Sequence, residues 1–408
     1  MVLKRTRLHL LSTSDQLVSN ATTGLSLHCH TAHSRESLDF LPVYADRIPL
    51  IAKMWRREYT HYRRREGRCI DFASAYWTPP LTPELVYATE KEQLIKAGLH
   101  AIVSITDHDS IEANLIVNSA HPTERAPVSM EWTVPFDRGF FHLGIHNLPP
   151  GDPSAVANLL LAYTDDPSVR SASKLDELFS FLHEMPGVLI VLNHPLWDIE
   201  MVGNETHQWL LGEFLKTHGR WIHAFEINGF RSWSENKAAL EMADSLDLPV
   251  VAGGDRHGCR PNTVINISNT DTFDGYADEL RNEKRNEIVL MPQYERPLIS
   301  RQLESFAEIL GHYPQLGAER TRWMQRMFFD VDDGKGLRSV FDLGVKKGPF
   351  WMRAAIRVLG VLGSPQIALL FRVARSRADR VPSTIDESQF WASDVEDISR
   401  NLSSEPVR

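Results

Sequence analysis

The sequence predicts an α/β fold in which short buried strands alternate with helices and close into a barrel. Short apolar runs recur along the chain between helical patterns, a rhythm typical of parallel β/α units. Six fragments also place a histidine or a carboxylate beside such a run: LSLHCH, ITDHD, MEW, FHLG, VLNHP and GGDRH. Because the carboxyl ends of parallel strands meet on one rim of a barrel, these side chains are expected to converge there.

The bulk composition is that of an ordinary globular protein. The chain has 408 residues, 42% of them hydrophobic and 24% charged, which allows one large domain and a smaller one. A net charge of -9 argues against a protein that coats nucleic acid, so no stable nucleic-acid complex is expected. Cys29, Cys69 and Cys259 match neither a disulfide framework nor a zinc ribbon. With no secretory or membrane-spanning pattern, the expected location is a reducing cytosol.

The first elements follow from local signals. Residues 1–23 form a lead-in without a clear pattern, and residues 24–30 are the first strand. Residues from about 36 to 80 are an insertion, partly helical, in which arginines and aromatic residues are mixed. Thr82 then caps a helix that has Pro83 at its first position and ends at Gly98. A strand at 101–106 follows, and then a short helix that begins at Asp109 or Ser110.

The later elements repeat the strand and helix alternation. Strands are predicted at 128–133, 140–146, 187–193, 221–228, 249–253, 264–268 and 287–291. Two helices lie between 147 and 185, and others at about 205–217 and 234–246. The predicted organisation is therefore a lead-in (1–23), a barrel (24–296), a helical C-terminal region (297–382) and an acidic, Ser-rich, disordered tail (383–408).

Two fragments have the spacing of paired metal ligands. Residues two apart in a strand point to the same side, so His28 and His30 project together while Cys29 faces away. Asp255 and His257 repeat this spacing near the end of a late strand. Two such side chains on one face can hold one divalent ion.

Single residues complete the constellation. Glu131 is a carboxylate in an otherwise apolar strand, where an acid is seldom buried unless it is paired or bound to metal, and its two oxygens can bridge two metals. His108, His142 and His194 each stand near a strand end. One such histidine alone is more often structural. The whole set is too rich for one ion and predicts two or three divalent metals, and so a hydrolase. Its ligand mix suits manganese, zinc or iron and does not choose among them.

The ordered series LHCHTAHS, SITDHDS, Glu131 with FHLG, NHP and GGDRHG resembles the polymerase-and-histidinol-phosphatase (PHP) family of metal-dependent phosphoesterases, over residues 24–292. The resemblance implies a distorted (β/α)7 TIM-like barrel, here with a helical C-terminal extension, and a trinuclear metal site. It implies three ligand sets: His28, His30, Glu131 and Asp255 for the first metal; Glu131, His142 and His194 for the second; His108 and His257 for the third.

The chain departs from the family pattern after its first His-x-His. The position where the family most often has an acid is Arg35, and the neighbouring Glu36 is expected to supply the missing ligand instead. If Arg35 points inward, its permanent charge could replace part of the role of a metal. Occupancy of the third metal site is therefore left open.

The chemistry expected of such a site is hydrolysis of phosphate esters. A hydroxide that bridges the metals would attack phosphorus, and Arg35 or Arg256 would stabilise the charge that develops on the phosphoryl oxygens. Asp107, Asp109 and Asn193 are candidates to orient the histidines, although a helix-capping role is the more ordinary reading of Asp109. The expected substrate is a small phosphomonoester or a nucleotide or oligonucleotide phosphate.

Three alternatives stay open at this point. The first is an amidohydrolase-like enzyme that cleaves C–N or C–O bonds, and the second is a weakened PHP barrel that serves only in binding. In the third, residues 346–377 lie on a membrane surface, because they mix apolar residues with arginines and lysines. Packing of this segment against the barrel or a second subunit is the more ordinary reading. The oligomeric state is not indicated.

Overall fold

The computed structural model describes residues 5–11, 21–39, 42, 49–199, 201–317, 320–346, 348, 350–364, 366–367, 371 and 381. The predicted tail at 383–408 lies outside these residues. Among the described helices, none combines the length and the apolar character that crossing a membrane requires.

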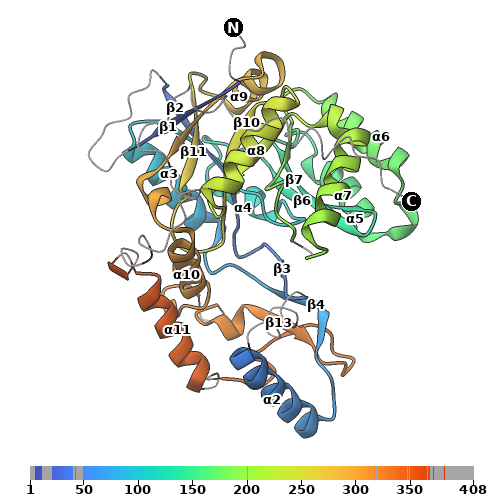
Figure 1. Ribbon diagram of the computed structural model, residues 1–408, viewed down its shortest axis with the longest axis vertical. Coiled ribbons are helices and arrows are strands. Elements are labelled where there is room, and N and C mark those ends of the chain that lie inside the picture. The colour runs from blue at the N-terminus through green and yellow to red at the C-terminus, as the bar shows by residue number, and fades with distance from the viewer. Residues whose placement is uncertain are drawn as a thin grey trace.

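A mixed sheet of ten strands forms the larger lobe of the molecule (Figure 1). In chain order its strands are β1 (Thr6–Leu10), β2 (Thr23–Cys29), β5 (His100–Ser104), β6 (Met130–Phe136), β7 (Gly139–His146), β8 (Leu189–Leu192), β9 (Ala224–Asn228), β10 (Val250–Arg256), β11 (Val264–Ser268) and β12 (Asn286–Leu290). The strand order is β1-β12-β11-β2-β10-β9-β8-β7-β6, with β5 paired to β2. The α/β fold class is confirmed.

Pairing around β2 places β5 and β6 close to each other. Strand β2 pairs in parallel with both β5 and β10, and β10, β9 and β8 continue in parallel. Strands β7 and β6 extend the sheet in antiparallel fashion. The segment after β5 then bonds to β6, since the Asp109 amide donates to the Glu131 carbonyl at 2.9 Å and the Glu131 amide to the Asp107 carbonyl at 3.2 Å. Backbone contacts thus run through β2, β10, β9, β8, β7 and β6 and return by way of β5.

Helices flank this sheet at the predicted places. They are α3 (Pro83–Lys96), α4 (Glu112–Ala120), α5 (Pro153–Asp165), α6 (Ala172–His183), α7 (Asn204–His218), α8 (Trp233–Ser245) and α9 (Phe273–Asp278). The Thr82 cap of α3 is confirmed, because its side chain accepts a hydrogen bond from the Leu85 amide. The expectation that Asp109 or Ser110 begins α4 is off by a few residues, since Ile111 is the residue before this helix.

The lead-in is more ordered than its sequence suggests. Strand β1 pairs in parallel with β12 over five residues, so the absence of a pattern in this region was misleading. Leu8 and Leu10 pack against the main hydrophobic cluster, and this burial explains why the segment joins the sheet. This strand is hard to recognise from the sequence because only two of its residues, Leu8 and Leu10, are apolar.

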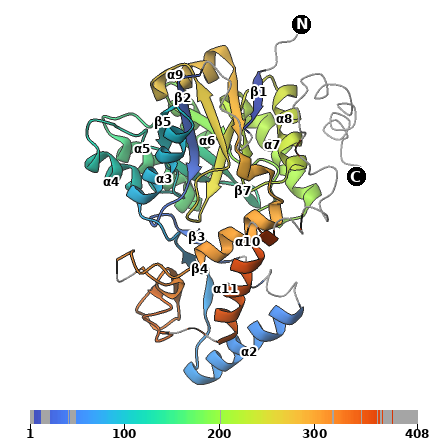
Figure 2. The same cartoon turned by 90° about the vertical axis from the view of Figure 1, so that its left-hand side faces the viewer.

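A smaller lobe lies beside the end of the sheet where β2 continues into β3 (Figures 1 and 2). It contains a four-stranded sheet of β3 (Glu36–Ser37), β4 (Asp71–Trp77), β13 (Met327–Asp330) and β14 (Arg338–Ser339). Helices α2 (Pro49–Glu66), α10 (Leu298–Ile309) and α11 (Phe350–Leu362) belong to the same lobe. The insertion and the C-terminal region therefore build one structure.

The prediction of a wholly helical C-terminal region is wrong. The aromatic cluster around Phe328 is strand β13, which pairs with β4 of the insertion, and Phe328 stacks on Tyr76 at 4.8 Å between ring centroids. The partner strand lies about 250 residues earlier in the chain, so no local pattern can indicate the pairing. The segment 346–377 contains α11, and its membrane-surface role stays untested.

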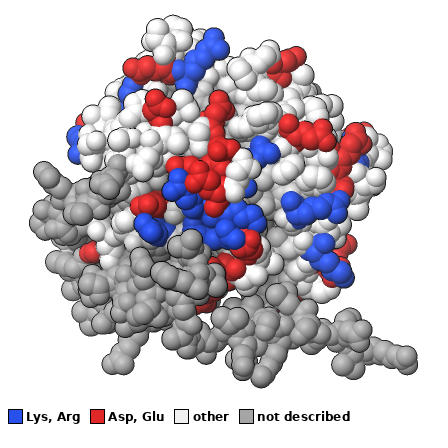
Figure 3. Space-filling model, turned by 90° about the horizontal axis from the view of Figure 1, so that it is seen from above, with Lys and Arg blue, Asp and Glu red and all other residues white. Residues whose placement is uncertain are grey.

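The face at the amino ends of the strands carries interleaved charges of both signs (Figure 3). Asp247 forms ion pairs with Arg5 and Lys284. Glu279 forms one with Arg285, whose Nη2 lies 3.4 Å from Glu279 Oε1. Because the charges of the described residues on this face are mixed in sign, these residues do not form the single-sign patch of a nucleic-acid-binding surface.

A buried histidine at this end makes stability sensitive to acid. Burial, together with the smaller effects of nearby Arg281 and His183, lowers the pKa of His223 to about 3. The imidazole Nδ1 accepts the Ile190 amide hydrogen at 3.0 Å. Between about pH 6.5 and pH 3 the unfolded chain therefore binds a proton that the folded chain does not, so acid lowers the free energy of unfolding by about 1.4 kcal/mol per pH unit through this group.

We expect His223→Asn to be less stable than the wild type at neutral pH, yet to lose less stability on acidification. Urea unfolding at about pH 7.5 and about pH 5 measures both effects. Equal losses in the two proteins would show that His223 does not contribute to the acid sensitivity.

Candidate metal centre

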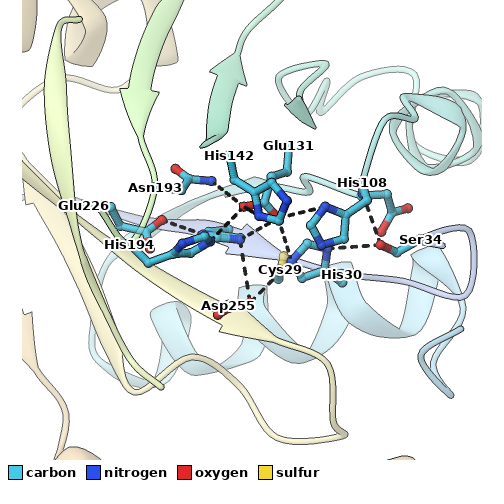
Figure 4. A network of polar contacts seen from close by, with 12 residues as sticks. Cys29, His30, Ser34, His108, Glu131, His142, Asn193, His194, Glu226 and Asp255 are labelled. Carbon is cyan, nitrogen blue, oxygen red and sulfur yellow. Dashed lines mark hydrogen bonds and ion pairs between the residues drawn. The ribbon is translucent and has the colours of Figure 1, made fainter. Parts of the chain in front are cut away.

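The predicted ligands come together at the end of the larger sheet that faces the smaller lobe (Figure 4). They stand on seven different segments: the end of β2, the start of β3, the turn after β5, β6, β7, the turn after β8, and the end of β10. The residues are His28, His30, Glu36, His108, Glu131, His142, His194, Asp255 and His257. All of them are buried except His108 and His257, which are partly exposed.

Glu131 lies at the centre, and its two oxygens face different histidines. Its Oε1 lies 3.2 Å from His194 Nε2 and 3.3 Å from His142 Nδ1. Its Oε2 lies 3.1 Å from His28 Nε2, 3.3 Å from His30 Nε2 and 3.4 Å from His108 Nδ1. A carboxylate with imidazoles on both sides has the arrangement needed to bridge two cations.

Glu36 is the second carboxylate that contacts several of the predicted histidine ligands. Its Oε2 lies 3.1 Å from His257 Nε2 and 3.2 Å from His108 Nε2, and its Oε1 lies 3.7 Å from His30 Nδ1. The structure thus brings Glu36 to the position expected of the substitute acid.

Three overlapping sets have ligand atoms within 4.8 Å of one another and could each hold a metal ion. They are His30, Glu36, His108 and His257; His28, His30 and Glu131; and His108, Glu131 and His142. They match the divalent-metal expectation in ligand type and in the sharing of Glu131. Neither the identity nor the number of the metals follows from them.

Two buried nitrogens test whether a cation fits this cluster. His30 Nε2 and His142 Nδ1 are fully buried, and although each lies 3.3 Å from an oxygen of Glu131, neither has the alignment of a hydrogen bond among the described residues. A cation between these nitrogens and Glu131 would give both of them a partner. The donor set of imidazoles and carboxylates therefore fits divalent metals.

The backbone at the site adopts conformations that side chains usually avoid. The φ angles of His28, His194 and Asp255 are 61°, 30° and 50°, in the left-handed region where non-glycine residues are uncommon. Such strain costs about 1–3 kcal/mol per residue and persists where the surrounding structure enforces it, typically at functional sites. Three of the nine predicted ligands share this feature.

Electrostatics within the cluster keep its acids ionised. Burial alone would raise the pKa of Glu131, but His28, His108 and His142 outweigh it and hold that pKa well below the usual range. The pKa of Glu36 is likewise depressed, by His108 and His257. Burial would lower the pKa of His108, yet Glu36 and Glu131 raise it to about 10. The acids are thus available as anionic ligands at neutral pH.

At two other rings, His30 and His142, burial outweighs the effect of the neighbouring acids on the pKa. Burial and, to a lesser extent, the neighbouring His257 together lower the pKa of His30 to about 3, despite the opposing effect of Glu36. Burial likewise lowers the pKa of His142 to about 4, despite the opposing effect of Glu131. Both rings are therefore neutral at physiological pH, the form in which an imidazole binds metal.

The two arginines predicted to act as catalytic cations contact residues other than the predicted metal ligands. Arg35 is exposed, and its guanidinium lies 5.3 Å from the centroid of the Tyr76 ring, on the side of the chain opposite Glu36. Arg256 is buried, donates to Glu90 at 2.7 Å, and alternates with Asp255 along β10. Strand alternation therefore turns both guanidinium groups away from the histidines.

The two aspartates of the TDHD fragment act on the backbone. Asp107 accepts hydrogen bonds from the amide and hydroxyl of Thr31 at 2.5 and 2.6 Å, and so fixes the turn after β2. Burial raises the pKa of Asp107 to about 6. Asp109 accepts from the Thr133 amide at 2.9 Å and does not cap α4. Both orient the ligand-bearing segments from outside the cluster.

Glu226 is the main residue of the site that was not among the residues predicted from the sequence. Its Oε2 lies 2.5 Å from His28 Nδ1, which leaves Nε2 of that ring directed at Glu131. Glu226 stands in the apolar strand AFEIN, the same signal that identified Glu131. A Cβ at Gly253 would collide with its carboxylate, so glycine is needed there for the close approach.

We expect Glu226→Gln to lower metal affinity about 10- to 100-fold while the chain stays folded. The amide keeps an acceptor for His28 but removes the charge that makes the ring a better donor to metal. Competition with a chelator measures the affinity. Glu287→Gln is the matched control, because Glu287 lies 2.8 Å from His9 at the far end of the sheet. Equal metal affinity in the two variants would remove Glu226 from the site.

Comparisons with known proteins give only distant likenesses. No family model matches the chain, and no curated protein matches it. Among solved structures, an amidohydrolase from Chromobacterium violaceum has a TM-score of 0.30 and 16% identity, and covers 44% of this chain and 84% of its own. A protein from Bifidobacterium adolescentis, described as a metal-dependent phosphoesterase, has a TM-score of 0.31 and 15% identity, with 59% and 90% covered. Similarity this low establishes neither a shared fold nor a shared activity.

Proposed function

We propose that this chain is a metal-dependent phosphoesterase of the PHP type, with residues 24–296 as a distorted (β/α)7 barrel. The observation that carries the proposal is Glu131, which is buried at the centre of the cluster with imidazoles around both of its oxygens. The return of backbone contacts from β6 through β5 to β2 supports the barrel.

The predicted ligands would form three metal sites, two of which share Glu131. His28, His30, Glu131 and Asp255 would hold one divalent cation, Glu131, His142 and His194 a second, and Glu36, His108 and His257 a third. When bound, such cations supply Lewis acidity toward phosphate oxygens and lower the pKa of water from 15.7 to about 7. The substrate phosphate would therefore lie against this cluster.

Contacts with neighbouring groups of the chain fix the orientation of three of the ligand histidines. Glu226 fixes the ring of His28, the Asp255 carbonyl accepts from His257 Nδ1 at 3.0 Å, and Ser34 Oγ lies 3.2 Å from His30 Nδ1. Each contact engages one ring nitrogen and leaves the other for the cluster. Arg35 and Arg256 have no proposed part in stabilising phosphoryl charge, because both guanidinium groups turn away from the histidines.

Partly exposed aromatic rings surround three of the ligand histidines. Trp77 lies 5.6 Å from His257, Phe140 5.0 Å from His142, and Trp197 5.1 Å from His194, measured between ring centroids. In the β3–β4 pair Trp77 is directly opposite Glu36, so both project to the side of the metal centre. These rings favour a substrate with a planar leaving group, such as a nucleotide.

We expect Trp77→Ala to raise KM about 10-fold for a nucleotide or aryl phosphate, with a smaller change for an aliphatic phosphate. Stacking of one base on an aromatic ring contributes about 1–3 kcal/mol. Trp209→Ala is the matched control, because Trp209 is an exposed tryptophan on α7, outside the smaller lobe. A KM increase of the same size for both substrate types would count against stacking by Trp77.

A substrate screen tests the reaction class. The full chain would be stripped of metal, reloaded with manganese, zinc or iron, and assayed against phosphomonoesters, nucleotides, lactones and amides. Turnover of phosphate esters is the expected result. Turnover of lactones or amides alone would establish the amidohydrolase alternative, and fewer than two ions per chain at saturation without turnover would favour a binding role.

A further inference from the structure

A cavity of about 120 Å³ lies between α10 and the loops that follow β9 and β10, and is large enough for more than one water molecule. Its lining is rich in arginine. Four of its side chains are guanidinium groups and two are carboxylates: Arg256, Arg260, Arg296, Arg301, Glu304 and Glu308. Ion pairs join Arg256 to Glu90, Arg296 to Glu304, and Arg260 to both Glu304 and Glu308.

Two of these arginines each bury one nitrogen that has no hydrogen-bond partner among the described residues. Arg256 is 2% exposed and uses Nε for Glu90 and Nη1 for the Gly258 carbonyl, which leaves Nη2 unsatisfied. Arg296 uses its Nη atoms for Glu304, Ser300 and the Gly363 carbonyl, which leaves Nε unsatisfied. A buried charged donor without a partner is costly, so both groups favour an anionic occupant.

The cavity is separate from the histidine cluster but shares strand β10 with it. Asp255 faces the histidines, whereas its neighbours Gly254 and Arg256 line the cavity. Helix α10 also holds both loops, since Arg301 donates to the Arg231 carbonyl at 3.3 Å and Glu308 accepts from the Cys259 amide at 2.7 Å. An occupant would therefore stabilise the loops that lead out of the two strands.

We propose that this cavity binds a phosphate-sized oxyanion, at a site separate from the metal centre. The anion would accept hydrogen bonds from Arg256 Nη2 and Arg296 Nε, the two buried donors of this cavity that have no partner among the described residues. Its binding requires no catalysis, so the inference stands whether or not the chain hydrolyses phosphate esters.

Phosphate binding in a variant with a disabled metal centre tests the inference. Calorimetric titration of chelator-treated, metal-free His194→Ala with inorganic phosphate is expected to show one site per chain, with a Kd below about 1 mM. Adding Arg296→Gln is expected to weaken this site at least 10-fold, and Ser305→Leu, which fills the cavity without changing its charge, is expected to abolish it. Absence of phosphate binding in His194→Ala, or binding that neither second change affects, would overturn the proposal.

A direct observation remains decisive if a variant fails to fold. In crystals of the wild-type chain grown with tungstate, the anomalous signal is expected beside Arg256 and Arg296. A strong signal at the histidine cluster with none in the cavity, at saturating tungstate, would overturn the proposal.

Discussion

Replacing either His30 or His194 by alanine is expected to reduce turnover of phosphate esters to below about 0.1% of wild type, a loss of about 4 kcal/mol in transition-state stabilisation. The two rings lie on opposite sides of Glu131, 3.3 Å from Oε2 and 3.2 Å from Oε1. His30 belongs to the first proposed metal site and His194 to the second. Either change would therefore remove one ligand from a centre whose cations are proposed to act together.

Both variants are expected to stay folded, because alanine removes a buried polar ring without placing a larger group in the core. Circular dichroism checks the fold, and steady-state kinetics with a nucleotide and an aryl phosphate check turnover. His100→Ala is the matched control, since His100 is an exposed histidine at the start of β5. Unaltered kinetics in either His30→Ala or His194→Ala would contradict the proposed function.

Much of the site could be predicted because the signals are local and repeated. A charged residue in an apolar strand, as at Glu131, or two histidines in alternation, as at His28 and His30, conflicts with simple core packing. Parallel strands then bring such residues to one end of a sheet without any knowledge of the pairing partners. The same reasoning applied to AFEIN would have found Glu226.

Side-chain direction at the strand ends could not be predicted as well. Arg35 and Arg256 are adjacent in sequence to predicted ligands, and adjacency suggested a shared site. In an extended chain neighbours point to opposite faces, so each arginine turns away from the cluster when Glu36 or Asp255 turns toward it. The positive φ angle of Asp255 is a further deviation that no sequence pattern indicates.

The smaller lobe could not be predicted because its sheet joins distant segments. Strands β4 and β13 carry aromatic residues in patterns too short to distinguish from an amphipathic helix, and their pairing is a tertiary effect. This pairing matters for function, because it helps to hold β4 against β3. It thereby places Trp77 beside His257 and Glu36 beside both partly exposed histidines.

Replacing Glu131 by glutamine is expected to reduce the metal content from two or three ions per chain to one or none. The carboxylate is ionised within a ring of imidazoles, and both of its oxygens face histidines. Glutamine offers one acceptor oxygen and one NH₂ group. The NH₂ group cannot bind a cation, so the histidines on that side lose their anionic partner.

The loss should appear in stability as well as in metal content. A ligand that binds only the folded state stabilises it by about 2.7 kcal/mol at 100 times its Kd, so added manganese or zinc should raise the Tm of the wild type by several degrees. Glu131→Gln should show a much smaller rise, and Glu84→Gln, which changes an exposed carboxylate on α3, should respond like the wild type. Elemental analysis and thermal unfolding measure the two effects. An equal metal content and an equal rise in Tm in Glu131→Gln would show that this buried carboxylate is not a bridge between cations.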